Sequence, residues 1–373
     1  MEGNHTSGPL VSIIINNYNY ARFLRDAIES ALGQTYPRTE VIVVDDGSTD
    51  NSREVIAGYH GRVRAIFKEN GGQASAFNAG FAASRGEIVI FLDADDLLLP
   101  HAVEEVVSVW RPGLSKVQWR LQLVTGELQP LPATWPMERS MPSGNLQESV
   151  LKWGYYPSPP TSGNAFARCL LERILPMPET EWRIAADSYL LLLAAVYGDV
   201  YSLDEVLGYY RVHGLNHWHF GDEDRIEKVK HKLEQQFAID HLKRKLLREI
   251  AQRHGLEFLD IPTPSRAKVE MAVALFNSEG LLALPLTPSR LRIALQGIYA
   301  AAFYPYMPSL WSRIRLIAWF LLTAISPRNV AKKIAVLGVL PTARPKWLAT
   351  LLRTAHRLSP LQSPSRGLGR VDK

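Results

Sequence analysis

Apolar and polar positions follow two different periods over the first hundred residues. Residues 21–32 and 73–84 place apolar side chains at helical spacing, so each stretch predicts a helix. Around these stretches, continuous apolar runs rich in β-branched residues predict buried strands. Those runs occupy residues 10–15, 40–45, 63–68 and 87–93. Repeated strand–helix units of this kind predict an α/β fold with a mostly parallel central sheet and helices on both faces.

The pattern changes after this repeat. Residues 117–124 alternate apolar and polar side chains and end at Thr125-Gly126, which predicts an antiparallel edge strand or a hairpin. Residues 129–144, rich in Pro, Ser and Met, predict a loop or flap. Residues 225–254 predict a long charged helix or a helix pair. We therefore expect an α/β domain at 1–220, a helical extension at 221–287 and a C-terminal region at 288–373.

Polar clusters follow three of the predicted strands directly. They are Asn16, Asn17 and Tyr18 after the first strand, Asp45 and Asp46 after the second, and Asp93, Asp95 and Asp96 after the fourth. Open parallel sheets bind ligands beyond the carboxyl ends of their strands. We therefore expect these side chains to share one rim and to form a site. Three carboxylates within four positions would be costly to bury unpaired, and a place at the rim avoids that cost.

Asp93 and Asp95 stand two residues apart at a strand end, where both can face one hard cation. Carboxylate oxygens are ligands of Mg²⁺ and Mn²⁺, and such an ion would hold a diphosphate and neutralise its charge as it leaves. The alternative is that Asp95 and Asp96 cap the following helix. The chain has no GxxxxGK[ST] motif and no GxGxxG motif after the first strand. Their absence disfavours a P-loop enzyme and a dinucleotide-binding protein.

Charge is unevenly distributed along the chain. From residue 290 onward there are 14 Lys and Arg residues and one acid, a charge of +13, whereas residues 1–289 carry −8. An acidic body joined to a basic tail suggests two different partners. The chain has a single cysteine, Cys169, and its N-terminus lacks a basic-then-apolar leader. Both features lead us to expect a cytoplasmic location, in a reducing compartment.

Two long motifs carry a family resemblance. They are VSIIINNYNYARFLRDAIESALGQTYPRTEVIVVDDGSTD from Val11 and NGGQASAFNAGFAASRGEIVIFLDADD from Asn70, followed by AADSYL and LGYYRVHGLN. In order and spacing, residues 8–220 resemble the family 2 glycosyltransferases. The resemblance implies a GT-A fold and an inverting enzyme that moves a sugar from a nucleotide diphosphate sugar to an acceptor hydroxyl, with Mg²⁺ or Mn²⁺. It favours a UDP-sugar as donor.

The same resemblance implies roles for individual residues. Asp187, in AADSYL, would be the general base that takes the proton from the acceptor hydroxyl, although a helix-start residue facing water is the alternative. Asp93, Asp95 and His213 would hold the metal ion. The residues implied to bind the donor are Asn16, Asn17, Tyr18, Asp45, Asp46, Lys68, Gln73, Asn78, Asp93, Ala94 and Arg211.

The sequence departs from the common pattern of the family at two places. Where many relatives have Ala-Arg-Asn, this chain has Ala76-Phe77-Asn78, so an arginine that often steadies the phosphates is missing. Lys68 or Gln73 would have to compensate. Where many relatives have Glu-Asp, this chain has Ala186-Asp187, which leaves the implied base without an acidic neighbour. Neither departure removes the implied metal pair or the base, so we expect an active enzyme.

Two apolar stretches in the C-terminal region predict contact with a membrane. Residues 293–312 carry no charge but contain two prolines, and residues 316–327 are more apolar but short. Short apolar segments flanked by arginines suit helices that lie in the headgroup layer, where anionic lipids attract the basic side chains. The alternative is a buried helical hairpin that packs on the α/β domain. Nucleic acid is disfavoured as a partner because the region is as apolar as it is basic and carries no recognised motif.

A transferase seated on a membrane suggests an acceptor on a lipid-linked glycan, as in bacterial surface-polysaccharide synthesis. We expect such a protein to be peripheral on the cytosolic face of the inner membrane. Two other functions stay open. A nucleotidyltransferase or sugar-nucleotide hydrolase on a similar sheet would use the metal pair but leave Asp187 without a role, and a non-catalytic scaffold would bind a sugar nucleotide without turnover.

Overall fold

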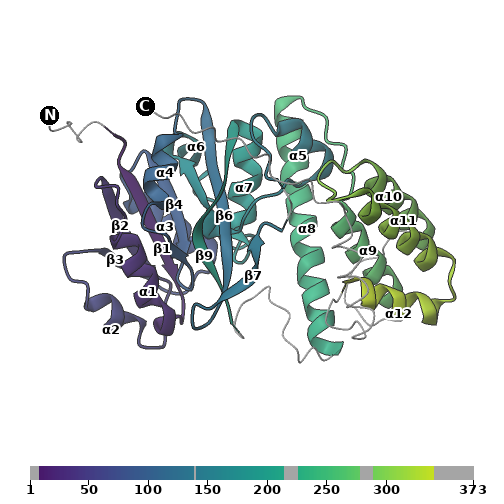
Figure 1. Ribbon diagram of the computed structural model, residues 1–373, viewed down its shortest axis with the longest axis horizontal. Coiled ribbons are helices and arrows are strands. Elements are labelled where there is room, and N and C mark those ends of the chain that lie inside the picture. The colour runs from purple at the N-terminus through teal and green to yellow at the C-terminus, as the bar shows by residue number, and fades with distance from the viewer. Residues whose placement is uncertain (1–7, 138–139, 214–225, 278–288, 340–373) are drawn as a thin grey trace, which may run out of the picture.

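The computed structural model describes residues 8–137, 140–213, 226–277 and 289–339 (Figure 1). Within them, a mixed sheet of nine strands has the order β3-β2-β1-β4-β8-β6-β9-β5, with β7 paired to β6. The strands are β1 Val11–Asn17, β2 Thr39–Asp45, β3 Arg64–Phe67, β4 Ile88–Asp93, β5 Leu97–Leu98, β6 Leu114–Thr125, β7 Pro130–Trp135, β8 Asn164–Ala167 and β9 Asp199–Val212. The α-helices are α1 Ala21–Leu32, α2 Ser52–Ala57, α3 Gln73–Ala83, α4 Ala102–Ser108, α5 Gln147–Trp153, α6 Arg168–Ile174, α7 Ala186–Tyr197, α8 Ile226–His254, α9 Pro264–Asn277, α10 Arg290–Phe303, α11 Leu310–Ile325 and α12 Arg328–Val339, and a 3₁₀ turn spans Thr161–Gly163.

The four strands predicted near the N-terminus are present and form the parallel half of the sheet. β1 pairs in parallel with β2 and with β4, and β2 pairs with β3. In this register Asn16 stands beside Asp93, and Asn17 stands beside Asp45. The three polar clusters therefore meet at one rim of the sheet, which confirms the prediction.

Apolar side chains pack against both faces of this sheet. Ile13 and Ile90 belong to a core that includes α1 and α4, whereas Ile14 and Phe91 belong to a second core that includes α3 and α7. Successive residues of a strand point to opposite faces, so a strand covered on both sides must be apolar throughout. This requirement explains the continuous apolar runs of the sequence.

The structure corrects the edge-strand and loop predictions for the second half of the α/β domain, and it confirms the alternative of a hairpin. β6 does not lie at an edge: it is antiparallel to β8 and parallel to β9, which flank it. Its alternating polar residues do not face water, because Lys116 Nζ is buried and donates to Gln118 Oε1 and Asn164 Oδ1, both at 2.8 Å. Residues 130–135, expected to be part of a loop or flap, form β7 and complete a hairpin with β6.

The C-terminal helices form a separate apolar core beside the α/β domain (Figure 1). Residues of α9, α10, α11 and α12 contribute to it together with Leu233 of α8, whereas Leu247 and Ile250 at the other end of α8 pack with the α/β domain. The predicted boundary at residue 288 and residues 340–373 lie outside the described residues. No helix in the described part of the chain is long and apolar enough to span a bilayer.

Helices α10 and α11 are antiparallel and cap one another. Arg290, at the start of α10, donates to the carbonyl of Ser326 at the end of α11 (3.2 Å). Arg313, near the start of α11, donates to the carbonyls of Ala302 (2.6 Å) and Tyr304 (2.9 Å) at the end of α10. Each arginine thus satisfies carbonyls that its partner helix leaves unpaired. Two of the arginines expected to flank membrane segments are used inside this hairpin.

Helix α3 can pack closely on β1 because residue 80 is glycine. A methyl group at Gly80 would overlap Ile14 Cγ2 and lie 3.2 Å from Val44 Cγ2. We predict that Gly80→Ala lowers the free energy of unfolding by about 1–3 kcal/mol through overpacking. Helix propensity alone would stabilise the same substitution by about 1 kcal/mol. Urea unfolding followed by tryptophan fluorescence measures the difference.

The exposed Ala82 on the same helix supplies the control for this prediction. Ala82→Ser should change the free energy of unfolding by no more than about 0.5 kcal/mol, because its side chain faces solvent. A urea midpoint for Gly80→Ala equal to or above that of the unchanged protein would contradict the packing described for α3.

Candidate active site

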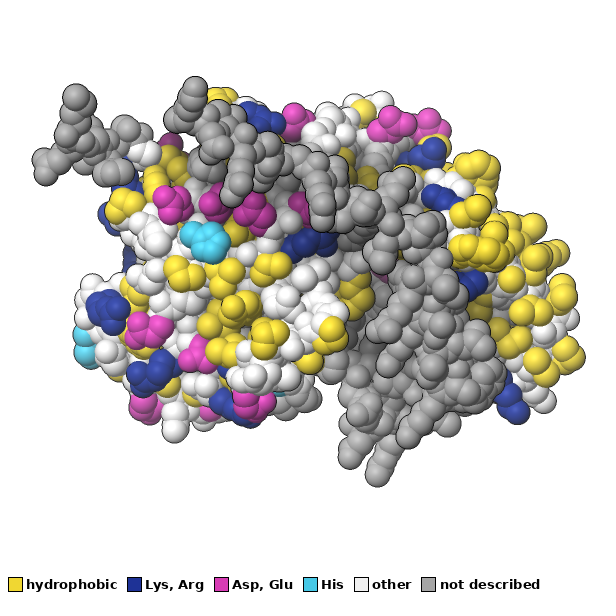
Figure 2. Space-filling view, viewed as in Figure 1, with side chains coloured by type: hydrophobic (Ala, Val, Ile, Leu, Met, Phe, Trp, Pro, Cys, Tyr) yellow, Lys and Arg dark blue, Asp and Glu magenta, His cyan; other side chains and the backbone are white. Residues whose placement is uncertain are grey.

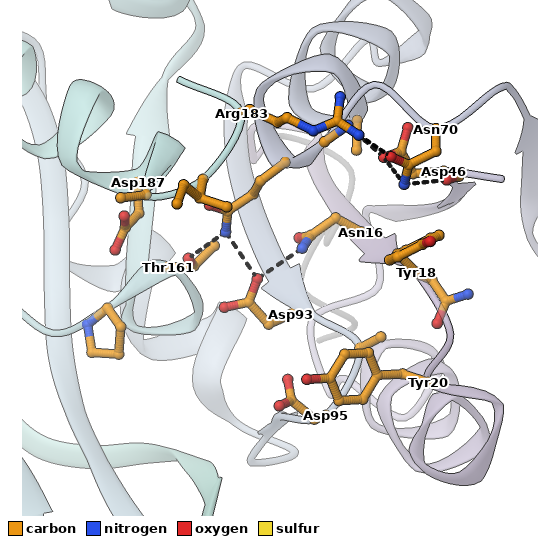
Figure 3. Close-up of a pocket in the computed structure, with 18 of the residues that line it drawn as sticks. Asn16, Tyr18, Tyr20, Asp46, Asn70, Asp93, Asp95, Thr161, Arg183 and Asp187 are labelled. Atoms are coloured by element: carbon orange, nitrogen blue, oxygen red, sulfur yellow. Dashed lines mark hydrogen bonds between the residues drawn. The ribbon is translucent and has the colours of Figure 1, made fainter. Parts of the chain in front are cut away.

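A pocket of about 380 Å³ opens at the carboxyl rim of the parallel strands (Figure 3). Its walls come from the ends of β1, β2 and β4, from the start of α3, from the segment before α7 and from β9. Nine residues named from the sequence line it: Asn16, Asn17, Tyr18, Asp46, Gln73, Asp93, Ala94, Asp95 and Asp187. The structure therefore brings the candidate metal pair and the candidate base into one cavity.

Asp93 occupies the centre of the pocket between β1 and α3. Its Oδ1 accepts hydrogen bonds from Asn16 Nδ2 (2.8 Å) and, at 3.5 Å, from Gln73 Nε2. Burial, and after it the neighbouring Asp95 carboxylate, raise the pKa of Asp93 to about 7, while the Asn16 hydrogen bond opposes that rise. The buried Asn16 Oδ1 has no hydrogen-bond partner among the described atoms, so it can accept from a ligand.

The other two carboxylates after β4 have different surroundings. Asp96 is buried, and it accepts from Ser162 Oγ (2.6 Å) and from the backbone N–H of Arg211 (3.0 Å). Burial, with the nearby Asp95 and Asp93, holds the pKa of Asp96 well above its usual value. Asp95 lines the pocket, and its Oδ2 lies 3.0 Å from Nε2 of His213. Asp96 therefore joins β4 to β9, and Asp95 remains at the pocket wall.

The pair Asp93 and Asp95 suits a divalent cation. Two carboxylates with poorly compensated negative charge are the donor set that Mg²⁺ and Mn²⁺ prefer, with water and substrate oxygens completing the coordination. In the described part of the chain, however, no group of three His, Cys, Asp or Glu side chains is arranged to hold a metal ion. The third expected ligand, His213, does not line the pocket and instead packs against Tyr20 and Phe23.

Asp187 lies in the first turn of α7 and faces the cavity from the side opposite Asp46 (Figure 3). The preceding Ala185 has a positive φ of 61°, a conformation that non-glycine residues rarely adopt and that is common at functional sites. Burial raises the pKa of Asp187, while Lys243 and the hydrogen bond from the Ser188 N–H oppose the rise. A raised pKa makes this carboxylate a stronger base than an ordinary aspartate.

Asp46 lines the pocket, but both oxygens of its carboxylate already accept hydrogen bonds from other residues of the chain. Its Oδ1 accepts from Lys68 Nζ (2.6 Å) and Gly71 N (3.0 Å), and its Oδ2 accepts from Gly72 N (2.7 Å) and Asn70 Nδ2 (3.1 Å). These four donors fill the lone pairs of the carboxylate. The contact with the donor expected for Asp46 would require one of them to leave. In this structure Asp46 orders the loop that leads into α3.

Four further residues named for donor binding do not line the pocket. Asp45 is buried behind it, where it accepts from Asn17 Nδ2 (2.9 Å). Lys68 is paired with Asp46, and Asn78 holds the backbone of Met177 through both its amide atoms. These side chains have partners within the chain and do not line the pocket, so their expected contacts with a donor stay predictions.

Arg211 is the fourth residue that was named for donor binding and does not line the pocket. Its guanidinium is buried, donates to Asp26 Oδ2 (2.8 Å) and the Gly126 carbonyl (3.1 Å), and stacks over the ring of Phe23. It therefore braces β9 against α1 and does not line the pocket, so its expected contact with the donor stays a prediction.

Several lining residues were not predicted from the sequence. They are Tyr20, Asn70, Gly72, Ala76, Pro160, Thr161, Arg183, Ile184, Ala185 and Tyr210. Tyr20 lies beside Asp95 in Figure 3, and burial together with Asp95 raises its pKa, so the phenol keeps its proton and can donate. Arg183 had one signal that could have found it: it is a charged residue four positions before Asp187. Thr161 and Tyr210 had none, because the chain path alone brings them to the rim.

Comparisons with known proteins identify the domain that carries this pocket. The sequence profile described as "Glycosyl transferase family 2" matches residues 12–121. An uncharacterized glycosyltransferase of Nostoc sp. strain PCC 7120 is 42% identical over 212 residues, 55% of this chain and 66% of that protein. Chondroitin synthase of Pasteurella multocida strain Pm70 is 48% identical over 99 residues, 26% of this chain and 10% of that protein.

A structural comparison gives a more distant likeness. A crystal structure of S. aureus TarS in complex with UDP-GlcNAc has a TM-score of 0.48 and 18% sequence identity, over 93% of this chain and 92% of that one. The chain spans just under two thirds of the Nostoc relative and about a third of the two relatives from Rickettsia typhi and Rickettsia prowazekii.

The α/β domain, with its strand-end aspartates, is a glycosyltransferase domain. Its residues 12–121 match glycosyltransferase family 2.

The environment of Asp187 leads to a prediction on stability. Because burial raises its pKa in the folded state, the charged form destabilises the fold, and this cost grows as pH rises from the unfolded pKa through the folded pKa. Asp187→Asn should therefore unfold at a temperature equal to or higher than the unchanged protein at pH 8, with a smaller difference at pH 5. Each kcal/mol corresponds to roughly 2–4 °C for a domain of this size.

Differential scanning calorimetry at both pH values tests this, with Asp199→Asn at an exposed strand start as the matched control. A variant of Asp187 that melts well below the unchanged protein at pH 8 would show that its charge stabilises the fold, contrary to this account.

Proposed function

We propose that the chain transfers a sugar from a nucleotide diphosphate sugar to an acceptor hydroxyl, with inversion of the anomeric carbon. In this reaction the acceptor oxygen forms a bond to the anomeric carbon, the bond from that carbon to the diphosphate oxygen breaks, and the acceptor proton passes to a base. The single observation that supports this most is that Asp187 and the pair Asp93–Asp95 face one cavity from different walls (Figure 3).

Asp187 is the base in this proposal. Its raised pKa places its proton affinity closer to that of the hydroxyl it serves as the oxygen attacks, and general-base catalysis of this kind contributes about 10²–10⁴-fold to rate. Attack from the wall that carries Asp187, with departure toward the wall that carries Asp93 and Asp95, is a single in-line displacement. A single displacement inverts the anomeric centre.

Asp93 and Asp95 would hold Mg²⁺ or Mn²⁺ beside the donor diphosphate. When bound, the ion would neutralise charge that develops on the departing diphosphate. Asn16, with its unpartnered Oδ1, and Tyr18 would receive the nucleoside at the other side of Asp93. A UDP-sugar is the donor we favour. Chondroitin synthase and hyaluronan synthase of Pasteurella multocida, each 48% identical over 99 residues, support a role in polysaccharide synthesis.

The decisive experiment combines donor binding and turnover. We expect the unchanged protein to release nucleoside diphosphate from one of a panel of UDP-, GDP- and dTDP-sugars in the presence of Mn²⁺ and acceptor. Asp187→Asn should bind that donor within about threefold, by calorimetry, and lose at least about 100-fold in kcat. The control Asp199→Asn should keep both. The acid limb of the kcat/KM profile should lie above the pH expected for an ordinary aspartate.

Three results would contradict the proposal. Release of pyrophosphate instead of nucleoside diphosphate would indicate a nucleotidyltransferase. Full turnover by Asp187→Asn would remove the assigned base. Retention of configuration in the product, read from the anomeric proton coupling in NMR spectra, would exclude a single displacement.

We also propose that the C-terminal helices seat the enzyme on an anionic membrane, where a lipid-linked glycan would be the acceptor. Helix α10 exposes large apolar side chains at every fourth residue, and α11 exposes more beside them. We call these residues the apolar stripe: Leu291, Leu295, Tyr299, Phe303, Leu310, Trp311, Ile314, Leu321, Leu322 and Ile325. Figure 2 shows apolar side chains gathered over these two helices. An exposed apolar patch that spans two helices marks an interaction surface.

Basic side chains around the apolar stripe indicate what it binds. Residues 290–339 contain seven Lys and Arg residues and no acid, and Arg292 and Arg315 are exposed beside the stripe. Each basic side chain near an anionic lipid surface contributes about 1 kcal/mol of attraction. Apolar side chains at the headgroup boundary, flanked by basic groups, describe an interfacial helix pair. The corresponding location is the cytosolic face of the inner membrane.

Vesicle sedimentation of the full chain tests the surface. The unchanged protein should sediment with vesicles that contain phosphatidylglycerol and less with pure phosphatidylcholine. The double variant Leu295→Ser/Phe303→Ser should lose at least about tenfold in partition coefficient, since two large apolar side chains no longer insert. Phe67→Ser/Leu259→Ser, two exposed apolar residues on other elements, is the control. Unchanged binding by the stripe variant, or a dimer that the variant dissociates, would overturn the membrane assignment.

A further inference from the structure

The pocket carries an excess of negative charge, and none of the lining residues predicted from the sequence is a Lys or Arg that would offset it. Four of its lining residues are aspartates: Asp46, Asp93, Asp95 and Asp187. Among the described lining residues a single Lys or Arg side chain is present, Arg183. A nucleoside diphosphate is itself anionic, so it enters such a pocket favourably only where cations offset the carboxylates. A metal ion at Asp93 and Asp95 would offset part of this charge.

Other cations near the rim are committed elsewhere. Lys68 Nζ lies 2.6 Å from Asp46 Oδ1 and donates to the Glu69 carbonyl at 2.6 Å. Arg211 is buried against Asp26. Phe77, at the position where the family resemblance implies an arginine, is buried and stacks on Phe91 with ring centroids 4.3 Å apart. Helix α3 therefore supplies no charge to the phosphates.

The backbone of Arg183 is held against the pocket rim. Gly72 has φ +88°, and a methyl group there would overlap Arg183 Cγ and lie 2.6 Å from Arg183 O. Gln73 N donates to that carbonyl oxygen (2.9 Å), and Gln73 Oε1 accepts from the N–H of Ala186 (3.0 Å). These contacts fix the segment that leads to Asp187 and leave the side chain of Arg183 exposed.

The guanidinium itself is lightly held. It donates to Asn70 Oδ1, a neutral acceptor on the loop that Asp46 orders (Figure 3). A neutral partner contributes less than a phosphate, because charge-assisted bidentate pairs between arginine and phosphate are among the strongest hydrogen bonds in proteins. The side chain can therefore exchange Asn70 for a phosphate oxygen without leaving a buried charge unpaired.

We infer that Arg183 binds the diphosphate of the donor, a role that the family resemblance implies for an arginine on α3. The inference rests on the proposed function, since it assumes a nucleotide diphosphate in this pocket. The arginine reaches the phosphates from the segment that carries the general base, four residues before Asp187. Donor binding and placement of the base are thereby joined in one stretch of chain held to Gly72 and Gln73.

Calorimetry with nucleotides alone tests this assignment. The probes are UDP, GDP and dTDP with Mn²⁺, each compared with its nucleoside. For the diphosphate that the unchanged protein prefers, Arg183→Ala should weaken binding by about 10- to 100-fold, the effect of losing charge-assisted hydrogen bonds. Affinity for the nucleoside should stay within about threefold. Arg183→Lys should give intermediate affinity, because lysine keeps the charge but not the planar fork.

The control is Arg62→Ala, an exposed arginine on another element, which should bind as the unchanged protein does. The contacts that fix the segment use the backbone of Arg183, so its alanine variant should keep its thermal midpoint. Diphosphate affinity of Arg183→Ala within threefold of the unchanged protein would overturn the inference. So would an equal loss for the nucleoside. If the unchanged protein binds none of the three diphosphates, the proposed function itself fails, which is a distinguishable result.

Discussion

Repulsion among the carboxylates at the end of β4 and directly after it is the constraint around which the site is built. They must be close to serve one pocket, and burial strengthens their mutual repulsion. The fold gives each a different neighbour: Asp96 accepts from Ser162 and the β9 backbone, Asp95 faces His213, and Asp93 faces Asn16. The charge that remains is negative and is concentrated on the pocket wall. Such a wall suits a ligand that arrives with its own cation.

The sequence predicted the parallel half of the sheet and its rim because both follow from local pattern. Apolar runs define buried strands, and parallel strands bring their carboxyl ends together, so the strand-end residues had to meet. The position of β6 could not be found this way. Its polar side chains suggested a solvent face, yet Lys116 and Gln118 are buried and satisfied by each other and by Asn164. Alternating apolar and polar residues indicate a solvent-exposed face of a strand only when the polar side chains lack hydrogen-bond partners inside the protein.

Which polar residues face the pocket was also beyond the sequence. The family resemblance supplied position along the chain, but a side chain near a rim can line the cavity or brace the wall behind it. Asp45, Asn78 and Arg211 support the wall behind the cavity, because each forms a hydrogen bond with another residue of the chain. Arg183 lines the cavity because Gly72 lets its backbone approach. For two of these four residues, Arg211 and Arg183, the partner lies more than a hundred residues away in the sequence. No local sequence pattern encodes such a contact.

Helix α8 belongs to both halves of the molecule. Leu233 near one end packs in the core of the C-terminal helices, and Leu247 and Ile250 near the other end pack in the core of the catalytic domain. Its 29 residues form a rod of about 43 Å. Trp153 of α5 also packs against Ala300 and Tyr304 at the end of α10, so the C-terminal helices contact the catalytic domain directly. With the apolar stripe resting on a bilayer, these contacts would hold the catalytic cavity at a fixed height above the lipid. The height of the catalytic cavity above the lipid would then set a minimum length for a lipid-anchored acceptor. Only a glycan with enough sugars to reach from the bilayer to the cavity could be extended.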